Sequence, residues 1–587
     1  MSDFFNKLCD KIFDNKKVFW TIFGLIILVS LGLRLTLINF PLWYDEGCSI
    51  ATAINSFPGG ITKYLWTHDL QHTPMYFYIL HFIMKIFGSG IVALRLSSLV
   101  VSILLLPVTF IVAEKLSSKK VALLAMLLMG VNTFQVLYSI EIRMYPYVIL
   151  LALLSINYLI DYDRKGDTAS LVKLGVVNVL NPYFLTGSIV FVLAEFIIYS
   201  SFLDSQKSGE EKMSKYIVSN LIVLLCYIPY FILIVHYAMV RSTFLVTDLS
   251  KFSSTNFWGL LQNFVGADAG HIHETRFEPF IQFLKGNNSL VFWENVTRVL
   301  KATALVFLPI ALMFVGLYKS IYDKEKLNRV LLGITLLSFV VFVFLAYNRT
   351  VAFTGRYLIF LTPFIFILMS IGICKYNKAI VALFTAYYTI ACICGFCMTY
   401  NGYKNIAEFS LKSPADFCAK NYPGKNNLVI MPFASSVSFY YFKGKDMPRV
   451  MPLELFYEVR DANSKIMYDA AQTKAFATGD KYKIFKDIIT SDTYISQNLV
   501  KYLNDYIDTV PKGGYIIWVV YYSDNYAILP PDVVKRIYSD DRNVRDMTMS
   551  GMLSKFDMDL INVLSRKAKF IKKDRDASNQ FFVFQKG

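Results

Sequence analysis

The sequence predicts a mainly α-helical membrane protein with about eleven transmembrane helices, followed by an extracytoplasmic α/β domain at the C-terminal end. Of the 587 residues, 55% are hydrophobic and only 17% are charged, whereas soluble proteins carry about 25% charged residues. Long apolar runs recur through residues 1–400, and the density of charged residues nearly doubles after them. We therefore predict two domains, a transmembrane domain at 1–400 and a soluble domain at 401–587.

Each predicted span is an apolar run, and crossing a bilayer takes roughly 20 such residues. The runs lie at residues 18–38, 92–113, 121–138, 145–160, 171–180, 184–202, 216–235, 299–317, 330–346, 357–373 and 379–398. The fifth run is short and Asn181-Pro182 follows it, so we expect it to be a half-span.

The distribution of Lys and Arg predicts the orientation. Residues 1–17 carry four lysines, and further Lys and Arg residues collect in every second loop. Cytoplasmic loops are enriched in these residues, so the N-terminus is expected in the cytoplasm of a multi-pass cell-membrane protein. Residues 76–87 are too short for a span and are predicted as an interfacial helix within an outer loop at 39–92. An odd number of spans then places residues 401–587 outside.

The soluble domain is predicted as α/β or α+β. Strand-like runs lie at 427–433, 437–442, 515–522 and 581–585, and a helical pattern covers 414–422. The net charge of +16 is attributed to cytoplasmic Lys and Arg and to anionic partners, and no nucleic-acid-binding module is evident.

The first candidate site residues are Asp45 and Glu46, which directly follow the first span beside Trp43 and Tyr44. Charged groups near the bilayer interior are costly and tend to be paired or functional. The alternative is an ordinary loop start with interfacial aromatic residues. Glu195 lies within a predicted span, where a paired or snorkelling role is favoured.

Further charged groups share the predicted outer side. They are the acid Glu141 and the basic residues Arg34, His68, His72, Lys85, Arg143, Arg349 and Arg356. An enzyme that uses a lipid-phosphate donor needs a carboxylate that takes a proton from the acceptor hydroxyl. It also needs cations that stabilise the departing phosphate. This set of residues fits that chemistry.

These residues lie in motifs that resemble the membrane glycosyltransferases of the GT-C fold, in the group of the protein O-mannosyltransferases and the lipid A aminoarabinose transferase. Over residues 18–400, the similar segments are Asp45-Glu46, His72-Thr-Pro-Met-Tyr-Phe-Tyr-Ile-Leu-His81, Lys85–Gly88, Ala93–Ser97, Tyr138–Tyr145 and Gly355-Arg-Tyr-Leu358. The group's second Pro is Thr73 here, and Glu141 stands where some relatives carry an Asp nearer to Tyr145.

The resemblance implies a polyprenyl-phosphate-linked sugar as donor and transfer with inversion to an extracytoplasmic protein, lipid or polysaccharide. It implies that Asp45 is the catalytic base, with Glu46 and Glu141 as further acids. The donor-binding residues would be Arg34, His72, Lys85, Arg143, Tyr145, Arg349, Arg356 and Tyr357. Neither the sugar (a hexose or a pentose) nor the acceptor follows from it.

No cofactor is predicted, and a divalent metal is compatible with the sequence but not indicated by it. His271 and His273 have the spacing of a metal pair, but a solvated loop is favoured because no further ligand cluster is evident. Two alternative functions remain: a flippase or transporter of lipid-linked glycans, and a polymerase or ligase of surface polysaccharide. A transporter predicts polar residues deep in several spans, and a ligase needs outer-loop arginines but no carboxylate base.

Overall fold

The computed structural model describes residues 15–68, 72–203, 207–232, 308–348, 354–408, 412–431, 440–442, 446–452, 497–521, 563–575 and 579–587, with the single positions 235, 257, 260, 261 and 264. These residues divide into two compact units. The first holds the described residues of 1–39, 52–240 and 249–403, and the second holds those of 40–51 and 404–587. The acidic segment around Asp45 therefore groups with the C-terminal residues, although the sequence assigns it to the transmembrane domain.

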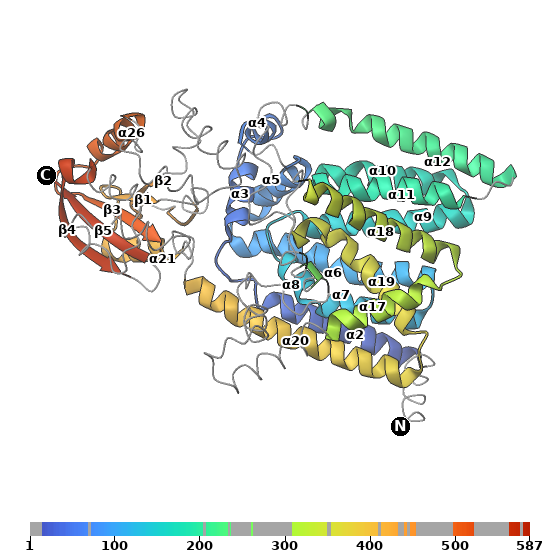
Figure 1. Cartoon of the computed structure of the whole chain (residues 1–587). Helices are drawn as coiled ribbons and strands as arrows, with labels where there is room; N and C mark the ends of the chain where they lie inside the picture. The colour runs from blue at the N-terminus through green and yellow to red at the C-terminus, as the bar shows by residue number, and fades with distance from the viewer. Residues whose placement is uncertain are drawn as a thin grey trace, which may run out of the picture. The chain divides into compact units, whose positions relative to one another are not determined.

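The first unit is built from helices (Figure 1). Its elements, including two that continue into the second unit, are α2 (Lys16–Leu35), α3 (Tyr44–Ala53), α4 (Gly59–His68), α5 (Met75–Phe87), α6 (Ile91–Leu116), α7 (Lys119–Val131), α8 (Thr133–Tyr138), α9 (Tyr145–Lys165), α10 (Thr168–Phe184), η1 (Thr186–Ser188), α11 (Ile189–Phe202), α12 (Lys207–Cys226), α17 (Leu308–Ile321), α18 (Lys326–Tyr347), η4 (Gly355–Leu361), α19 (Thr362–Ile373) and α20 (Lys378–Glu408). Helix α19 is buried along its whole length and packs against α7, α17 and α18, so it forms the centre of the unit.

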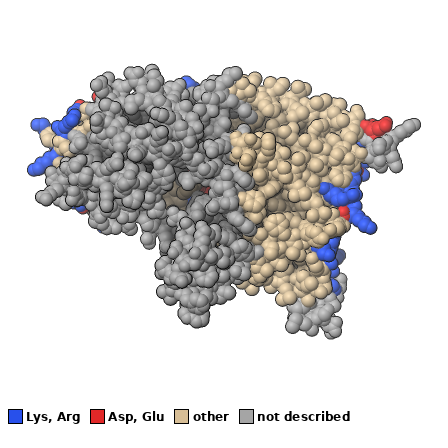
Figure 2. Space-filling view, in the orientation of Figure 1, with Lys and Arg blue, Asp and Glu red and all other residues tan. Residues whose placement is uncertain are grey.

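Six helical segments among the described residues are long and apolar enough to cross a membrane. They are Lys16–Leu35, Ile91–Leu116, Tyr145–Lys165, Lys326–Tyr347, Gly355–Ile373 and Lys378–Asn401. Figure 2 shows a wide uncharged surface on the visible face of this unit, with Lys and Arg gathered at one end. The chain is therefore a multi-pass membrane protein. The count of eleven spans stays a prediction, as does the interfacial position of α5, which has 13 residues.

The predicted span at 121–138 consists of two helices, because the helix breaks at Asn132. The side chain of Asn132 accepts a hydrogen bond from the backbone nitrogen of Gln135 (3.0 Å) and so caps the separate helix α8. Its amide nitrogen also donates to the hydroxyl of Tyr388 (3.3 Å). The break places α8 directly before the motif at residues 138–145.

The predicted break at Asn181-Pro182 is wrong, because α10 continues through Pro182 to Phe184. Proline has no backbone N–H, so a helix that contains it leaves the carbonyl four residues earlier without its usual donor. Here that carbonyl belongs to Asn178, and the hydroxyl of Tyr227 donates a hydrogen bond to it. A neighbouring segment thus replaces the missing bond, which the local sequence does not reveal.

The second unit contains a five-stranded sheet in the order β2-β1-β3-β5-β4. The strands are β1 (Leu428–Met431), β2 (Arg449–Pro452), β3 (Tyr515–Tyr521), β4 (Ala568–Arg575) and β5 (Asn579–Lys586), and the helices α21 (Lys412–Asn421) and α26 (Gln497–Asp508) belong to the same unit. Strand β1 pairs in parallel with β2 and β3, whereas β5 is antiparallel to β3 and β4. Apolar side chains cover both faces of the sheet.

Three of the predicted strands coincide with β1, β3 and β5. The strand predicted at 437–442 is wrong where the structure describes it, because Tyr440 and Tyr441 are helical. The sequence missed β2 and β4, which are the two edges of the sheet. Edge strands often carry lysine and little apolar alternation, and β4 reads Ala-Lys-Phe-Ile-Lys-Lys-Asp-Arg.

Candidate functional site

The acidic pair lies in the first turn of α3, in the second unit. Carboxylates are stabilised at a helix N-terminus by the backbone dipoles and the unpaired N–H groups. The carbonyl of Trp43 accepts the first helical hydrogen bonds, from the backbone nitrogens of Glu46 and Gly47 (both 3.1 Å). Trp43 is therefore the N-cap residue of α3, and Asp45 is the second residue of the helix.

The two acids differ in what they do for the helix. Glu46 is buried, and its Oε2 accepts a hydrogen bond from the backbone nitrogen of Trp43 (2.9 Å). This contact is the return half of a capping box, in which an acid at the third helical position bonds the N-cap amide. Asp45 is half-buried. Glu46 thus has a structural part at the helix start, and Asp45 is the more accessible of the two.

The first unit brings His72 and Arg143 together. Nη2 of Arg143 lies 3.0 Å from Nε2 of His72. A guanidinium only donates hydrogen bonds, so Arg143 is the donor of this bond and Nε2 of His72 is the acceptor. Arg143 is 3% exposed and lies in the turn between α8 and α9. The result is a buried cation that is hydrogen-bonded to a histidine.

The segment that carries Arg143 is short and well anchored. The backbone nitrogen of Arg143 donates to the carbonyl of Glu141 (2.7 Å), and the side chain of Glu141 is half-buried. Tyr145, at the start of α9, is fully buried, and its ring lies edge-on to that of Tyr138 (centroids 5.1 Å apart). These contacts hold the turn between two helices of the bundle.

The segment that carries His72 is tied to α10. Thr73 is buried, and its hydroxyl donates to the carbonyl of Pro182 (3.3 Å). The ring of His72 lies edge-on to Phe77 of α5 (6.2 Å between centroids). Thr73, the departure from the Pro of related motifs, thus makes a contact that a proline cannot make.

The remaining basic candidates have different surroundings. Arg34 is buried and donates from Nη1 to the side chain and carbonyl of Ser30 and to the carbonyl of Gly130 (3.0 Å for each carbonyl), which joins α2 to α7. Lys85 is exposed in the last turn of α5. Arg356 lies in η4 with its guanidinium over the ring of Tyr357 (5.6 Å), and η4 packs against α9. Donor binding by these residues stays a prediction.

Two sets of predicted residues lie outside the described part of the chain, namely Arg349 and the histidines 271 and 273. Within the described part, no group of three or more His, Cys, Asp or Glu side chains lies close enough together to hold a metal ion. The hydroxyl of Tyr441 lies 2.7 Å from the backbone nitrogen of Leu42. The sequence gives no sign of this contact.

Comparison with known proteins adds the family context. Residues 71–233 match the family model described as dolichyl-phosphate-mannose-protein mannosyltransferase. This range holds both His72 and Arg143. The predicted resemblance to GT-C glycosyltransferases is confirmed. Among curated protein sequences, no significant match is found.

Two similar solved structures are of ArnT from Cupriavidus metallidurans, one in the apo state and one bound to undecaprenyl phosphate. Both are 10% identical to this chain, and each alignment covers 97% of this chain and 98% of the other. The TM-scores are 0.53 for the apo structure and 0.50 for the bound one. The likeness shows a shared fold, and the alignments extend over nearly the whole chain.

Proposed function

We propose that the chain is an integral-membrane glycosyltransferase that moves a sugar from a polyprenyl-phosphate donor to an extracytoplasmic acceptor. The observation that carries the proposal is the hydrogen-bonded pair of His72 and the buried Arg143, within the residues that match the mannosyltransferase model. The undecaprenyl phosphate bound to ArnT and the donor named in that family's description support a lipid phosphate as the carrier of the sugar.

In the proposed reaction, Asp45 takes the proton of the acceptor hydroxyl as a general base. The hydroxyl oxygen attacks the anomeric carbon from the face opposite the phosphate, so the configuration inverts. The bond from the anomeric carbon to the phosphate oxygen breaks, and the electron pair leaves with the polyprenyl phosphate. Glu141 is proposed to orient the acceptor.

Arg143 and His72 are proposed to bind the phosphate, where negative charge grows as the bond breaks. A guanidinium suits this task because its fixed fork matches two phosphate oxygens. Arg34, Lys85, Tyr145, Arg349, Arg356 and Tyr357 are proposed as further donor-side residues. No metal is part of this mechanism.

We place the reaction outside the cytoplasmic membrane, with the N-terminus in the cytoplasm and the second unit on the outer side. A transporter of lipid-linked glycans is the alternative, and it predicts polar side chains along a path through the spans. Glu195 offers little support for such a path, because its hydrogen bonds go to Ser155, Asn178 and Tyr216 within the bundle.

The test uses membranes that contain the protein and a panel of polyprenyl-phosphate sugars, each labelled in the sugar. The proposal predicts loss of label from one donor and its appearance in an acceptor, absent from membranes without the protein. Movement of an intact labelled lipid across the bilayer, with no loss of sugar, would favour the transporter instead.

A further inference from the structure

The second unit contains both the C-terminal sheet and the acidic segment, and a hydrogen bond links this segment to Tyr441, which packs against the sheet. The backbone nitrogen of Leu42 donates to the hydroxyl of Tyr441 over 2.7 Å. The two residues are 399 positions apart in the chain. This contact gives the C-terminal residues a direct part in shaping the segment that carries the proposed base.

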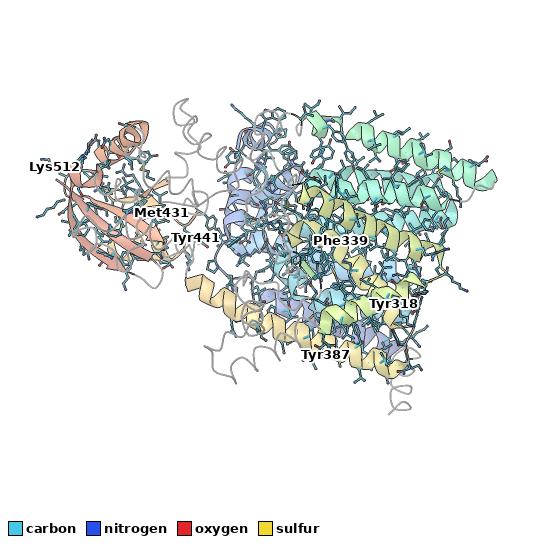
Figure 3. The ribbon with its side chains drawn as sticks, viewed as in Figure 1. Tyr318, Phe339, Tyr387, Met431, Tyr441 and Lys512 are labelled. Atoms are coloured by element: carbon cyan, nitrogen blue, oxygen red, sulfur yellow. The ribbon has the colours of Figure 1, made fainter. Side chains whose placement is uncertain are left out.

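Tyr441 is itself firmly placed. Its ring packs against the apolar cluster on one face of the sheet, which includes Met431, Val519 and Phe581, and Figure 3 shows Tyr441 and Met431 in this unit. Tyr440 lies edge-on to it, with 5.4 Å between the ring centroids. The hydroxyl is therefore carried by a half-buried ring that packs against this cluster, so the ring loses less conformational freedom than an unpacked one when the bond forms.

The bond meets a need at the start of α3. Leu42 is buried, and it precedes the N-cap residue Trp43, so no helical carbonyl is available to its N–H. A buried backbone N–H without a partner is costly. Glu46 satisfies the next amide, that of Trp43. Two consecutive amides are thus bound, that of Leu42 by Tyr441 and that of Trp43 by Glu46 of the helix itself.

These two bonds fix the direction in which α3 begins, and Asp45 is its second residue. A general base must lie within hydrogen-bond reach of the proton that it takes, and a displacement of about 1 Å can cost 100-fold in rate. We propose that Tyr441 is a positioning residue, through which the C-terminal residues of the second unit hold the acidic segment in its reactive geometry. This inference rests on the proposed function of Asp45.

The test compares Tyr441→Phe with wild type in the full-length protein in lipid nanodiscs. The variant removes one hydroxyl and keeps the ring in its cluster. Tyr422→Phe is the matched control, because Tyr422 packs in the same cluster and its hydroxyl donates to Asp574 (2.8 Å) within the same unit. Hydrogen exchange of the peptide that covers residues 40–51 and the kinetics of sugar transfer are measured for each.

The inference predicts faster exchange at the amide of Leu42 in Tyr441→Phe. It also predicts a kcat lower by about tenfold, as expected for one lost hydrogen bond, with the KM for the donor unchanged. Tyr422→Phe should leave both the exchange of this peptide and kcat as in wild type. A wild-type kcat for Tyr441→Phe, or a KM effect alone, would overturn the positioning role.

Failure of the proposed function can be distinguished from failure of the positioning role of Tyr441. If wild type transfers sugar from no donor, the proposed function fails, and hydrogen exchange alone decides whether Tyr441 holds the acidic segment. Unchanged exchange in Tyr441→Phe would then overturn the inference as well, whereas faster exchange would support the structural link.

Discussion

Arg143 donates a hydrogen bond to Nε2 of His72 over 3.0 Å, although the two residues are 71 positions apart in the chain. In this bond Nε2 of His72 is the acceptor, because a guanidinium only donates. The bond also links the turn before α9 to the segment before α5. The proposed phosphate site rests on this pair, and each of its two members can be changed separately.

Replacing Arg143 by Lys keeps the charge but loses the planar guanidinium, whose N–H groups can bond His72 and the proposed phosphate at the same time. We expect kcat/KM for the lipid donor to fall by about 10- to 100-fold, as for the loss of a hydrogen bond to a charged group. Transfer of labelled sugar at several donor concentrations measures this. Arg329→Lys is the control, since Arg329 is exposed on α18, and an equal loss there would contradict the assignment.

Substitutions of Glu46 and of Asp45 should have different effects, because Glu46 caps the helix whereas Asp45 is the proposed base. Glu46→Gln keeps an oxygen that can accept from Trp43, so we expect near-wild-type stability and transfer. Glu46→Ala removes the capping bond and should cost about 1 kcal/mol at the helix start. Thermal unfolding and hydrogen exchange of residues 40–51 report this cost. If Glu46→Gln abolished transfer in a stable protein, Glu46 would have a chemical role beyond its cap.

The carboxyl of Glu195 is predicted to carry a proton, because its hydrogen bonds with Ser155 and Asn178 need more hydrogens than these two partners supply. It contacts Ser155 and Asn178, which also contact each other. The three side chains thus form a closed set of three hydrogen bonds, which needs three hydrogens. The hydroxyl of Ser155 supplies one of them, and the amide of Asn178 supplies one more. Either orientation of the amide leaves one contact that the carboxyl must supply.

Glu195→Gln should therefore be tolerated, because a glutamine amide provides the same donor and acceptor. Glu195→Ala should destabilise the bundle, since it leaves a cavity and unpaired buried groups worth about 1–3 kcal/mol each. Thermal unfolding in detergent compares the two variants. Equal, large losses for both would show that a charged carboxylate is required instead.

The C-terminal sheet should weaken in acid. Side-chain hydrogen bonds from Lys567 and then Lys586 lower the pKa of Asp508. A lowered pKa in the folded state stabilises the fold above the ordinary carboxyl value of about 3.9. This contribution is lost as the pH falls through the lower, folded-state value. The effect is small because the groups are exposed to solvent.

Hydrogen exchange of peptides from α26 and β5 can follow this loss between neutral pH and pH values below the ordinary carboxyl range. Asp508→Asn removes the titrating group, so its exchange should depend less on pH than that of wild type. The same acid dependence in both proteins would assign the effect to other carboxylates.

The sequence predicted those elements in which local composition decides the structure. Long apolar runs gave α2, α6 and α18, and runs of buried β-branched and aromatic residues gave β1, β3 and β5. The missed strands β2 and β4 are edges with little apolar alternation. The sequence predicted a break at Pro182, but the helix continues there because the hydroxyl of Tyr227 replaces the lost backbone bond. Tyr227 is 49 positions from Asn178, so the local sequence does not reveal this contact.

The candidate site was predictable as a set of residue types, but its pairings were not. Nothing near His72 identifies Arg143 as its partner, because the contact depends on how the segments before α5 and α9 pack. The same holds for Tyr441 and Leu42. The capping role of Glu46 is local, however, and an acid three positions after a helix N-cap is a pattern that the sequence already contained.

The central claim is a sugar transfer that depends on Asp45, and its most direct test compares wild type with Asp45→Asn at matched expression. Both proteins are given the polyprenyl-phosphate sugar that wild type consumes, and loss of labelled sugar from the lipid is followed. Removing a general base should slow transfer by about 100- to 10,000-fold. Undiminished transfer by a folded Asp45→Asn variant would contradict the account.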